Sequence, residues 1–357
     1  MKSRMNDLLT FLKRDSPEIT AVVMPDFFLD RLINFECDSS SFSTIVADIA
    51  KRKGGSIDGI AQTDLRGGNA VNTASALAAL GVNVTPIICT NRYGLQQLQY
   101  YLKPSRVDLS HVKVLEKASL TTALELKSKS GKANVMLRDL GSLADFGSAN
   151  LTEDDYKAIE TADYMCLFNW AGTRRNGTEL ARNVFQRVKA KKTGKTYFDT
   201  ADPTPNREKI PVLMKNVLKT ELVDILSLNE NEAVTYASLI SKEIDAQRDG
   251  KRFDELALES ARLLARQLPA RIDLHTTSFS GTFTKKGETS VPALKIKSLR
   301  ATGAGDAWNA GNILGDASEL SAECRLLLAN AVAACYVSSF EGAHPSREQL
   351  IRFLGKL

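Results

Sequence analysis

Short apolar runs alternate with longer amphipathic segments along most of the chain. The apolar runs are rich in β-branched and aromatic residues and predict buried strands at 19–24, 84–90, 164–170, 196–203 and 271–277, with another that runs into a helix at 225–233. The amphipathic segments repeat their apolar residues at helical spacing and predict helices at 69–81, 179–192, 255–268, 303–315 and 324–340. Strands and helices that alternate in this way indicate an α/β fold whose parallel sheet is covered by helices on both faces.

Two stretches break this alternation. Residues 31–66 are polar and rich in serine and glycine, and residues 112–139 alternate like exposed antiparallel strands around a Ser-Gly-Lys turn. We expect both to contribute strands to a small β-sheet that projects over one edge of the main sheet as a lid, with a decorative insertion as the alternative. Residues 1–18 predict a helical N-terminal extension, which precedes one α/β domain at 19–357.

The composition excludes several classes of protein. Of the 357 residues, 43% are hydrophobic and 25% charged, which is typical of a globular protein. The net charge of +5 is spread over 47 basic and 42 acidic residues, too mild and too evenly mixed to predict a nucleic-acid partner but compatible with a small anionic ligand. Five scattered cysteines and three distant histidines have no metal-like spacing, so we expect reduced thiols and no zinc site.

The N-terminal segment is amphipathic and lacks the apolar centre of a signal peptide. No stretch of the sequence approaches the roughly 18 apolar residues that a transmembrane helix needs. We therefore expect a cytoplasmic protein without a membrane partner.

The most informative motif is the turn Gly303-Ala304-Gly305-Asp306, which opens a predicted helix. Glycines let the backbone approach a phosphate closely, and amides at a helix start can hold oxyanions. A carboxylate at that place can accept the proton of an attacking hydroxyl in phosphoryl transfer. An aspartate that simply caps the helix is the alternative for Asp306, and the motif alone leaves the two interpretations even.

A second glycine pair, Gly67-Gly68, comes directly before another predicted helix. It is followed by Asn69 and Asn72, whose amides fall on one face of that helix and suit hydrogen bonding to a polyol. A packed turn with incidental asparagines is the alternative.

Acidic and amide residues also follow two predicted strands, at the edge where open α/β sheets bind their ligands. Asp26 and Asp30 come after the first strand and would accept hydrogen bonds from sugar hydroxyls. Asn229 and Glu232 follow a later strand and would face nucleotide phosphates through a hydrated Mg²⁺. A helix start rich in acids for dipole reasons is the alternative for this pair.

Together and in this order, these motifs resemble those of the ribokinase-like (PfkB) carbohydrate kinase family over roughly residues 19–345. Gly67-Gly68 with Asn72 is similar to the first family signature, and TGAGDAWNAG at 302–311 is similar to the second, more specific one. Residues 229–232 fit the Asn-x-x-Glu magnesium motif of the family.

The resemblance implies a doubly wound, mostly parallel sheet with a β lid. It also implies a Mg²⁺-dependent kinase that transfers the terminal phosphate of a nucleotide, ATP by default, to a hydroxymethyl group of a sugar. The residue roles implied are Asp306 as base, the amides of Ala304, Gly305 and Asp306 as anion hole, Asp30 as the group that grips the acceptor, and Thr276, Thr302, Asn229 and Asn330 on the nucleotide side. Lids of this family often pair between subunits, which predicts a homodimer.

Two departures from the family pattern carry predictions. Arg300-Ala301 replaces the usual Asp-Thr, whose aspartate helps to hold a monovalent cation. Because the guanidinium of Arg300 is always charged, we expect it to stand in for that cation and to make activity independent of potassium. Residues 273–278 replace the usual Thr-Leu-Gly segment, so ADP stays open as the phosphate donor beside ATP.

The acceptor is left open among three classes. Asn69 stands where some sugar-binding members have lysine, so a plain sugar is not fixed. A cluster of arginines would suit a sugar phosphate through bidentate contacts, although each alone is typical of a solvated surface charge; the candidates are Arg66, Arg138, Arg174 and Arg175. A nucleoside would stack on an aromatic ring, for which Phe27, Phe28 and Trp170 are candidates.

The sequence argues against two functions outside the kinase class. A non-catalytic nucleotide sensor on the same fold is disfavoured by the intact Asp306, glycines and Asn-x-x-Glu motif. A nicotinamide oxidoreductase is excluded because the chain lacks the glycine fingerprint of a dinucleotide site.

Overall fold

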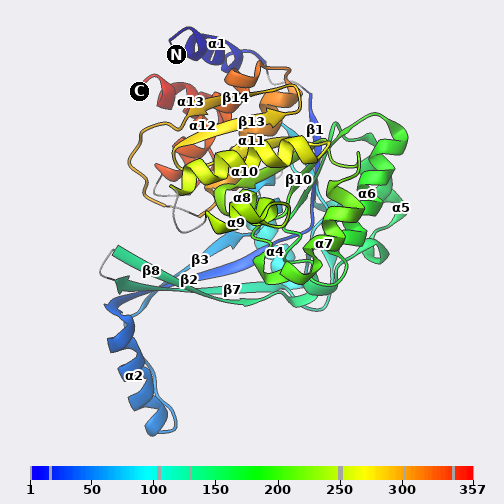
Figure 1. Cartoon of the computed structure of the whole chain (residues 1–357). Helices are drawn as coiled ribbons and strands as arrows, with labels where there is room; N and C mark the ends of the chain where they lie inside the picture. The colour runs from blue at the N-terminus through cyan, green and yellow to red at the C-terminus, as the bar shows by residue number, and fades with distance from the viewer. Residues whose placement is uncertain are drawn as a thin grey trace.

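The computed structural model describes residues 2–15, 18–102, 106–128, 131–247, 252–300, 302–339 and 342–356. The strands of its main sheet are β1 (Thr20–Met24), β4 (Asn83–Pro86), β9 (Tyr164–Phe168), β10 (Lys195–Asp199), β11 (Ile225–Asn229), β12 (Arg271–His275), β13 (Phe279–Thr284) and β14 (Gly287–Pro292). These eight strands lie in the order β14-β13-β12-β11-β10-β9-β1-β4, parallel from β4 to β12 and antiparallel from β12 to β14 (Figure 1). The mostly parallel sheet predicted from the alternation of strands and helices is therefore confirmed.

Helices cover both faces of this sheet. The larger ones are α1 (Lys2–Leu12), α3 (Asn69–Ala79), α4 (Arg92–Tyr101), α5 (Glu153–Thr161), α6 (Gly177–Lys191), α8 (Glu230–Ser238), α10 (Phe253–Gln267), α11 (Ala304–Ala317), α12 (Ala322–Val337) and α13 (Arg347–Leu354), and two short ones are α7 (Ile210–Leu213) and α9 (Lys242–Ala246). Successive residues of β1 point to opposite faces: Val22 and Met24 pack in a core with α5, α6, α8 and α10, whereas Ala21 and Val23 pack in a core with α1, α3, α11, α12 and α13. The doubly wound arrangement follows from this alternation of side chains.

The lid is a separate sheet of four strands. They are β2 (Phe28–Asp38), β3 (Ala61–Gly67), β7 (Ser119–Ser128) and β8 (Gly131–Asp139), in the order β3-β2-β7-β8. Figure 1 shows this sheet extending from one side of the main body. A lid built from the two inserts was expected, although β2 begins at Phe28, before the first insert.

Two elements differ from the prediction. The first insert contains a helix, α2 (Ser39–Lys51), which has no buried residue and projects away from the lid (Figure 1). The predicted strand at 84–90 is divided: β4 ends at Pro86, and β5 (Cys89–Thr90) pairs with β6 (Lys113–Val114) in a sheet of its own. Proline has no amide donor and is found at sheet edges, which accounts for the end of the edge strand β4.

The N-terminal helix α1 belongs to the same core as the rest of the domain. Leu8 and Leu12 are buried, and α1 packs against α12 and α13. Within the described residues, no helix is both long and apolar enough to cross a lipid bilayer.

Candidate active site

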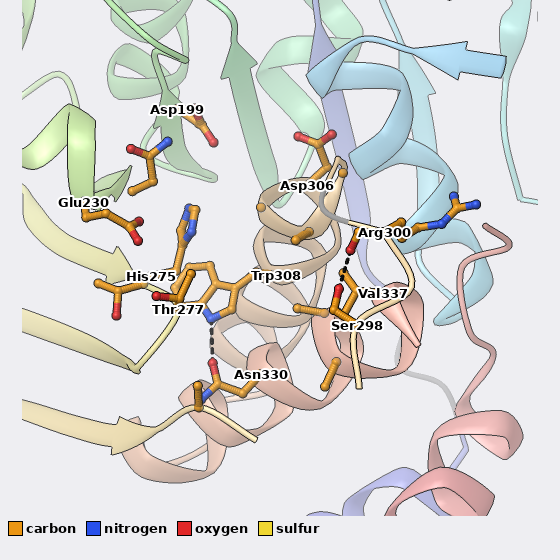
Figure 2. Close-up of a pocket in the computed structure, with 18 of the residues that line it drawn as sticks. Asp199, Glu230, His275, Thr277, Ser298, Arg300, Asp306, Trp308, Asn330 and Val337 are labelled. Carbon is orange, nitrogen blue, oxygen red and sulfur yellow. Dashed lines mark hydrogen bonds between the residues drawn. The ribbon is translucent and has the colours of Figure 1, made fainter. Parts of the chain in front are cut away.

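A cavity of about 670 Å³ lies where β10, β11 and β12 end and α11 begins. Its lining includes the whole Gly303–Asp306 turn together with Asn69, Asn229, Glu232, Thr276 and Asn330. Figure 2 shows Asp199, Glu230 and His275 on one side of the start of α11 and Arg300 on the other. The fold therefore brings together residues that lie far apart in the sequence, at the carboxyl edge of the parallel strands.

The glycine turn is shaped for close approach of the backbone. Gly303 is the N-cap of α11 with φ of 81°, and a Cβ at this position would lie 2.8 Å from the hydroxyl oxygen of Tyr336. The first intrahelical bond of α11 runs from the Ala307 amide to the Gly303 carbonyl. The amides of Ala304, Gly305 and Asp306 precede that bond and lie at the positive end of the helix, where an oxyanion is stabilised.

Asp306 lies in the first turn of α11 and is 6% exposed. Its two carboxylate oxygens accept hydrogen bonds from the side-chain amides of Asn69 (2.9 Å) and Asn72 (3.0 Å). Burial, reinforced by the negative charges of Asp199 and Asp26, raises the pKa of Asp306 to about 8 although the two amides oppose this rise. Because the N-cap position belongs to Gly303, Asp306 is not the capping residue, and its carboxylate is suited to accept a proton near neutral pH.

Asn72 is in turn fixed by Arg66, at the end of the lid strand β3. The Arg66 guanidinium donates to the Asn72 side-chain oxygen (3.1 Å) and to the Ser75 hydroxyl (2.8 Å), and it lies 3.2 Å from Nδ1 of His344. Burial lowers the pKa of Arg66. Sequence reasoning placed Arg66 among candidate arginines for the acceptor, but the structure turns it toward α3 and the C-terminal segment.

Asp26 is fully buried and accepts three hydrogen bonds. Two come from the amides of Asn69 (2.9 Å) and Ala70 (2.8 Å), at the start of α3, and one comes from the Asn169 side chain (2.8 Å). Gly68, with φ of 99°, allows this approach, because a Cβ there would lie 2.8 Å from the Asp26 carbonyl oxygen. Sequence reasoning expected Asp26 to bind the acceptor, whereas in the structure its carboxylate anchors the helix that carries Asn69 and Asn72.

Asp30 lies on the lid strand β2 and reaches across Gly67. A Cβ at Gly67 would lie 2.0 Å from a carboxylate oxygen of Asp30, so only glycine fits there. Burial raises the pKa of Asp30, opposed by a hydrogen bond with Thr121 and by the charge of Arg138. The other oxygen, Oδ1, is buried without a partner among the described residues. Asp30 thus has an unused acceptor beneath the lid.

Arg138 is the arginine of the predicted cluster that lies beside Asp30. It stands opposite Thr121 in the lid sheet, with its guanidinium 4.8 Å from the centre of the Phe28 ring. Arg174 and Arg175 are exposed instead, and Arg175 pairs with Asp145.

The aromatic candidates for a nucleoside are all buried. Phe27 and Trp170 are 1% exposed and Phe28 is 3% exposed, and the Trp170 ring donates to the Thr178 hydroxyl. None of the three therefore offers a free ring face for stacking.

Asn229 and Glu232 form a reciprocal capping box at the start of α8. The Glu232 carboxylate accepts from the Asn229 amide (2.9 Å) and side chain (2.8 Å), while the Asn229 side-chain oxygen accepts from the Glu232 amide (3.0 Å). The alternative interpretation of this pair, a helix start rich in acids, also applies to α8. Both residues nevertheless line the cavity.

The acidic groups near this capping box have room for a hydrated divalent cation. Burial and the charge of Asp199 raise the pKa of Glu232 well above its usual value, and burial raises that of Asp199. Asp202 and Glu230 line the same cavity. No three His, Cys, Asp or Glu side chains are grouped for direct metal coordination in the described part of the chain. The donors at this place are carboxylate and amide oxygens, which are the type of ligand that Mg²⁺ prefers.

Asp199 was missed by sequence reasoning. It is the last residue of β10, and its carboxylate accepts from the Ala201 amide (2.9 Å) and the Asn309 side chain (2.7 Å). The rule that drew attention to Asn229, a polar residue where a parallel strand ends, would also have found it.

The far end of the cavity is formed by the turn after β12 and by α12. The Thr276 hydroxyl accepts from the amides of Ser278 (3.1 Å) and Phe279 (3.0 Å) and so fixes the turn. The Asn330 side chain accepts from Trp308 (3.0 Å) and donates to the Pro292 carbonyl (3.1 Å). The side-chain amide of Asn330 therefore shapes the wall of the cavity. Thr302, the remaining residue predicted for the nucleotide side, is exposed just before Gly303.

Arg300 fills the space between the glycine turn and the C-terminal segment. Its guanidinium lies so close to Gly342 that a Cβ there would be 1.9 Å from Nη1. It also donates to the Tyr336 hydroxyl (3.4 Å), and the Tyr336 ring stacks on His344 at 4.5 Å. A fixed positive charge thus lies beside the glycine turn.

Solved structures of known proteins share this fold at low sequence identity. A nucleoside kinase from Methanocaldococcus jannaschii superposes with a TM-score of 0.67 at 16% identity, covering 96% of this chain and 100% of that one. A ribokinase from Arabidopsis thaliana, complexed with ribose and ATP, has a TM-score of 0.66 at 16% identity and covers 95% and 99% of the two chains. A putative ribokinase II from E. coli, in complex with ATP and Mg²⁺, has a TM-score of 0.69 at 15% identity with the same coverage.

The sequence itself has no match among curated proteins. Residues 43–349 match the family model described as pfkB family carbohydrate kinase. This span contains both glycine motifs, the Asn-x-x-Glu motif and the lid strands β3, β7 and β8. The chain therefore belongs to the pfkB family of carbohydrate kinases, and it is a phosphotransferase.

Proposed function

We propose that the protein transfers the terminal phosphate of ATP to a hydroxymethyl group of a sugar, with Mg²⁺ as cofactor. The observation that carries this proposal is the buried carboxylate of Asp306, with its raised pKa, in the same helical turn as the free amides of Ala304 and Gly305. A proton acceptor and an anion site so close together serve two reactants, the attacking hydroxyl and the phosphate under transfer.

The chemistry of the step follows from this placement. The acceptor oxygen forms a bond to the terminal phosphorus while the bond from that phosphorus to the bridging oxygen breaks, and ADP leaves. Asp306 takes the hydroxyl proton, and the amides of residues 304–306 hold the phosphate oxygens. The lid excludes water, so that the phosphate goes to the acceptor.

Asn229 and Glu232 would hold the Mg²⁺ through water, with Asp199 facing the same space. When bound, the ion supplies positive charge that balances the phosphates. The ATP and Mg²⁺ complex of the E. coli neighbour supports this donor and cofactor, while a ribokinase from Cryptococcus neoformans complexed with ADP leaves ADP as the alternative donor.

On the acceptor side, Oδ1 of Asp30, which has no partner among the described residues, would accept a hydrogen bond from a sugar hydroxyl. Arg138 beside it favours a sugar phosphate as the second candidate, because a guanidinium binds phosphate in bidentate fashion. A nucleoside is the weakest candidate, since Phe27, Phe28 and Trp170 have no free face, although the M. jannaschii neighbour is a nucleoside kinase.

A crossed activity screen tests this proposal. ATP and ADP with Mg²⁺ are each combined with sugars, sugar phosphates and nucleosides, and phosphorylated product is measured. We expect product with ATP and a sugar or sugar phosphate, and Arg138→Ala to reduce turnover of phosphorylated acceptors more than that of plain sugars. Absence of transfer in every combination would contradict the proposal.

We further propose that the protein acts in the cytoplasm as a homodimer joined through the lids. One lid face carries exposed apolar residues on neighbouring strands, namely Leu120, Val135 and Leu137. Contact with a second lid would remove this apolar surface from water and cover the edge strands.

A further inference from the structure

The imidazole of His275 lies at the anion site without a hydrogen-bond partner for one of its nitrogens. His275 is the last residue of β12, and its Nε2 is buried with no partner among the described residues. Buried polar atoms are nearly always satisfied in folded proteins. An unsatisfied nitrogen that faces a ligand cavity therefore indicates a missing partner.

The position of the ring points to what that partner is. A Cβ built on Gly305 would lie 3.2 Å from Cε1 of His275, so the imidazole rests directly on the first turn of α11. On its other side the ring packs against Trp308, with 4.9 Å between ring centres. Figure 2 shows the imidazole standing between Glu230 and the start of α11, within the cavity. The ring is thus held beside the amides that would bind phosphate.

The charge state of the ring fits a hydrogen-bond donor. Burial lowers the pKa of His275 to about 4, so the imidazole is neutral at physiological pH. A neutral imidazole carries one N–H and can donate it to an oxyanion, as a neutral histidine at a helix start does in other enzymes.

We propose that His275 donates a hydrogen bond from Nε2 to a phosphate oxygen of the donor nucleotide. This inference rests on the proposed function and adds a binding residue to it. The proposal also gives a role to residues 273–278, where the chain differs from the usual family segment. In this segment His275, at the end of β12, would bring an imidazole to the phosphates.

Binding measurements without acceptor test the inference. Isothermal titration with adenosine, AMP, ADP and a non-hydrolysable ATP analogue, all with Mg²⁺, would be carried out on the wild type, His275→Phe and His275→Gln. Phenylalanine keeps a ring against Trp308 but has no N–H, whereas glutamine restores a donor. Circular dichroism would verify that each variant is folded.

We expect His275→Phe to bind adenosine as the wild type does and to lose about 10- to 100-fold in affinity for the ligands that carry the contacted phosphate, because the lost bond joins a charged group. His275→Gln should recover most of this loss. In the series from adenosine through AMP and ADP to the ATP analogue, the first ligand that loses affinity identifies which phosphate His275 contacts.

Equal affinities of His275→Phe and the wild type for every nucleotide would overturn the inference, and so would a loss of the same size for adenosine. Failure of the wild type to bind any nucleotide would instead overturn the proposed function. Proton and nitrogen NMR of the imidazole gives an independent readout, since the Nε2 signal should shift on addition of the phosphate-bearing ligand and stay in place with adenosine.

Discussion

At the scale of single residues, the position of the Asp306 carboxylate is fixed by side chains that are themselves held in place. Asn69 donates to one oxygen and is anchored through its amide by the buried Asp26. Asn72 donates to the other oxygen and is oriented by Arg66, which binds its side-chain oxygen. The Asp306 carboxylate is therefore preorganised by two asparagines, and each asparagine is itself held by a charged group.

The positive charge of Arg66 should also influence the pH range in which Asp306 can act, because the two groups interact. The base works when deprotonated, so kcat/KM for the acceptor should rise with pH around the pKa of about 8. Arg66 and Asp306 attract each other, and removing the positive charge would raise the pKa of Asp306 further. Arg66→Met should therefore move the rise in kcat/KM to higher pH and lower the rate at neutral pH about 10-fold.

A pH profile of kcat/KM for the wild type, Arg66→Met and Arg66→Lys checks this prediction. The lysine variant keeps the charge, and its midpoint should stay closer to that of the wild type. A methionine variant with reduced activity but an unchanged midpoint would mean that Arg66 supports only the packing.

Arg300 carries a prediction about monovalent cations. Its guanidinium lies against Gly342 and Tyr336, next to the glycine turn, and supplies a permanent positive charge there. Steady-state rates should therefore be the same in potassium and in a bulky organic cation, whereas Arg300→Ser should lose activity and regain part of it with potassium. Strong activation of the wild type by potassium would refute this role.

The residues that sequence reasoning found are those whose chemistry is local. Asp306 and its glycines are neighbours in one turn, so the sequence shows directly that a carboxylate stands in a candidate anion site. The orientation of Arg66 depends on His344, and the role proposed for His275 depends on Gly305 and Trp308; all three partners are distant in the sequence. Only the packing of β3 and β12 against the helices brings these partners together.

At the scale of elements, α11 joins the active site to a buried ionic cluster. Its start carries Asp306, and its next turns present Asn309 and Asn312 to the sheet. Asn309 binds Asp199 at the carboxyl edge of the sheet, and Asn312 binds Asp273 (2.9 Å) farther along. The cluster beyond consists of Asp273, Asp316, Arg271 and Arg325.

The cluster predicts a large stability effect at Asp273. This carboxylate is fully buried and lies 2.9 Å from both Arg271 and Arg325. Asp273→Asn should lower the free energy of unfolding by about 3–5 kcal/mol, because the buried Arg325 loses its counter-charge at 2.9 Å and keeps only Asp316 at 3.9 Å. Glu288→Gln, in the exposed pair with Arg262, should cost less than about 1 kcal/mol in the same urea titration.

The Asp273 carboxylate also determines in which direction the stability of the fold changes with pH. Although burial opposes ionisation, the two arginines hold the pKa of Asp273 well below its usual value. Its contribution is therefore complete above the pKa of an unfolded aspartate and is lost as pH falls toward the folded value. The difference between the wild type and Asp273→Asn should shrink in acid; a difference that is constant with pH would contradict this account.

Elements with strong periodicity were predictable, whereas those set by context were not. β1, α3, α6, α10 and α11 lie close to their predicted ranges, because α6 and α10 each bury one face and β1, α3 and α11 bury most of their residues in a core. α2 was missed because its serine-rich sequence buries nothing and gives no core-facing signal, although Phe42 contacts Phe35. β5 was merged with β4 because the apolar run continues through the point where the chain leaves the main sheet.

At the scale of the whole molecule, the topology determines where chemistry can occur. The parallel strands β10, β11 and β12 end at one edge, and α11 begins there with its amides free. The lid strand β2 begins and the antiparallel strand β3 ends at the same edge, where they hold Asp30 and Arg66. The residues proposed for the phosphate donor and for the acceptor therefore lie next to the lid sheet, although they come from all parts of the sequence.

The exposed face of the lid predicts the assembly state. Leu137 is 59% exposed and lies on the same face as Val135, opposite Thr122 and Leu124 of β7. If two lids pair, Leu137→Asp should convert a dimer to a monomer in analytical ultracentrifugation. Met136→Asp, which places the same charge on the opposite face of β8, should leave the dimer intact. A monomeric wild type would rule out lid pairing.

The variant Asp306→Asn tests most directly whether Asp306 is the base of a phosphoryl transfer. Asparagine keeps the size of the side chain but cannot accept the hydroxyl proton. With the donor and acceptor found by the activity screen, kcat should fall about 10²- to 10⁴-fold while the Kd for the nucleotide changes little. An unchanged kcat in Asp306→Asn would contradict the mechanism.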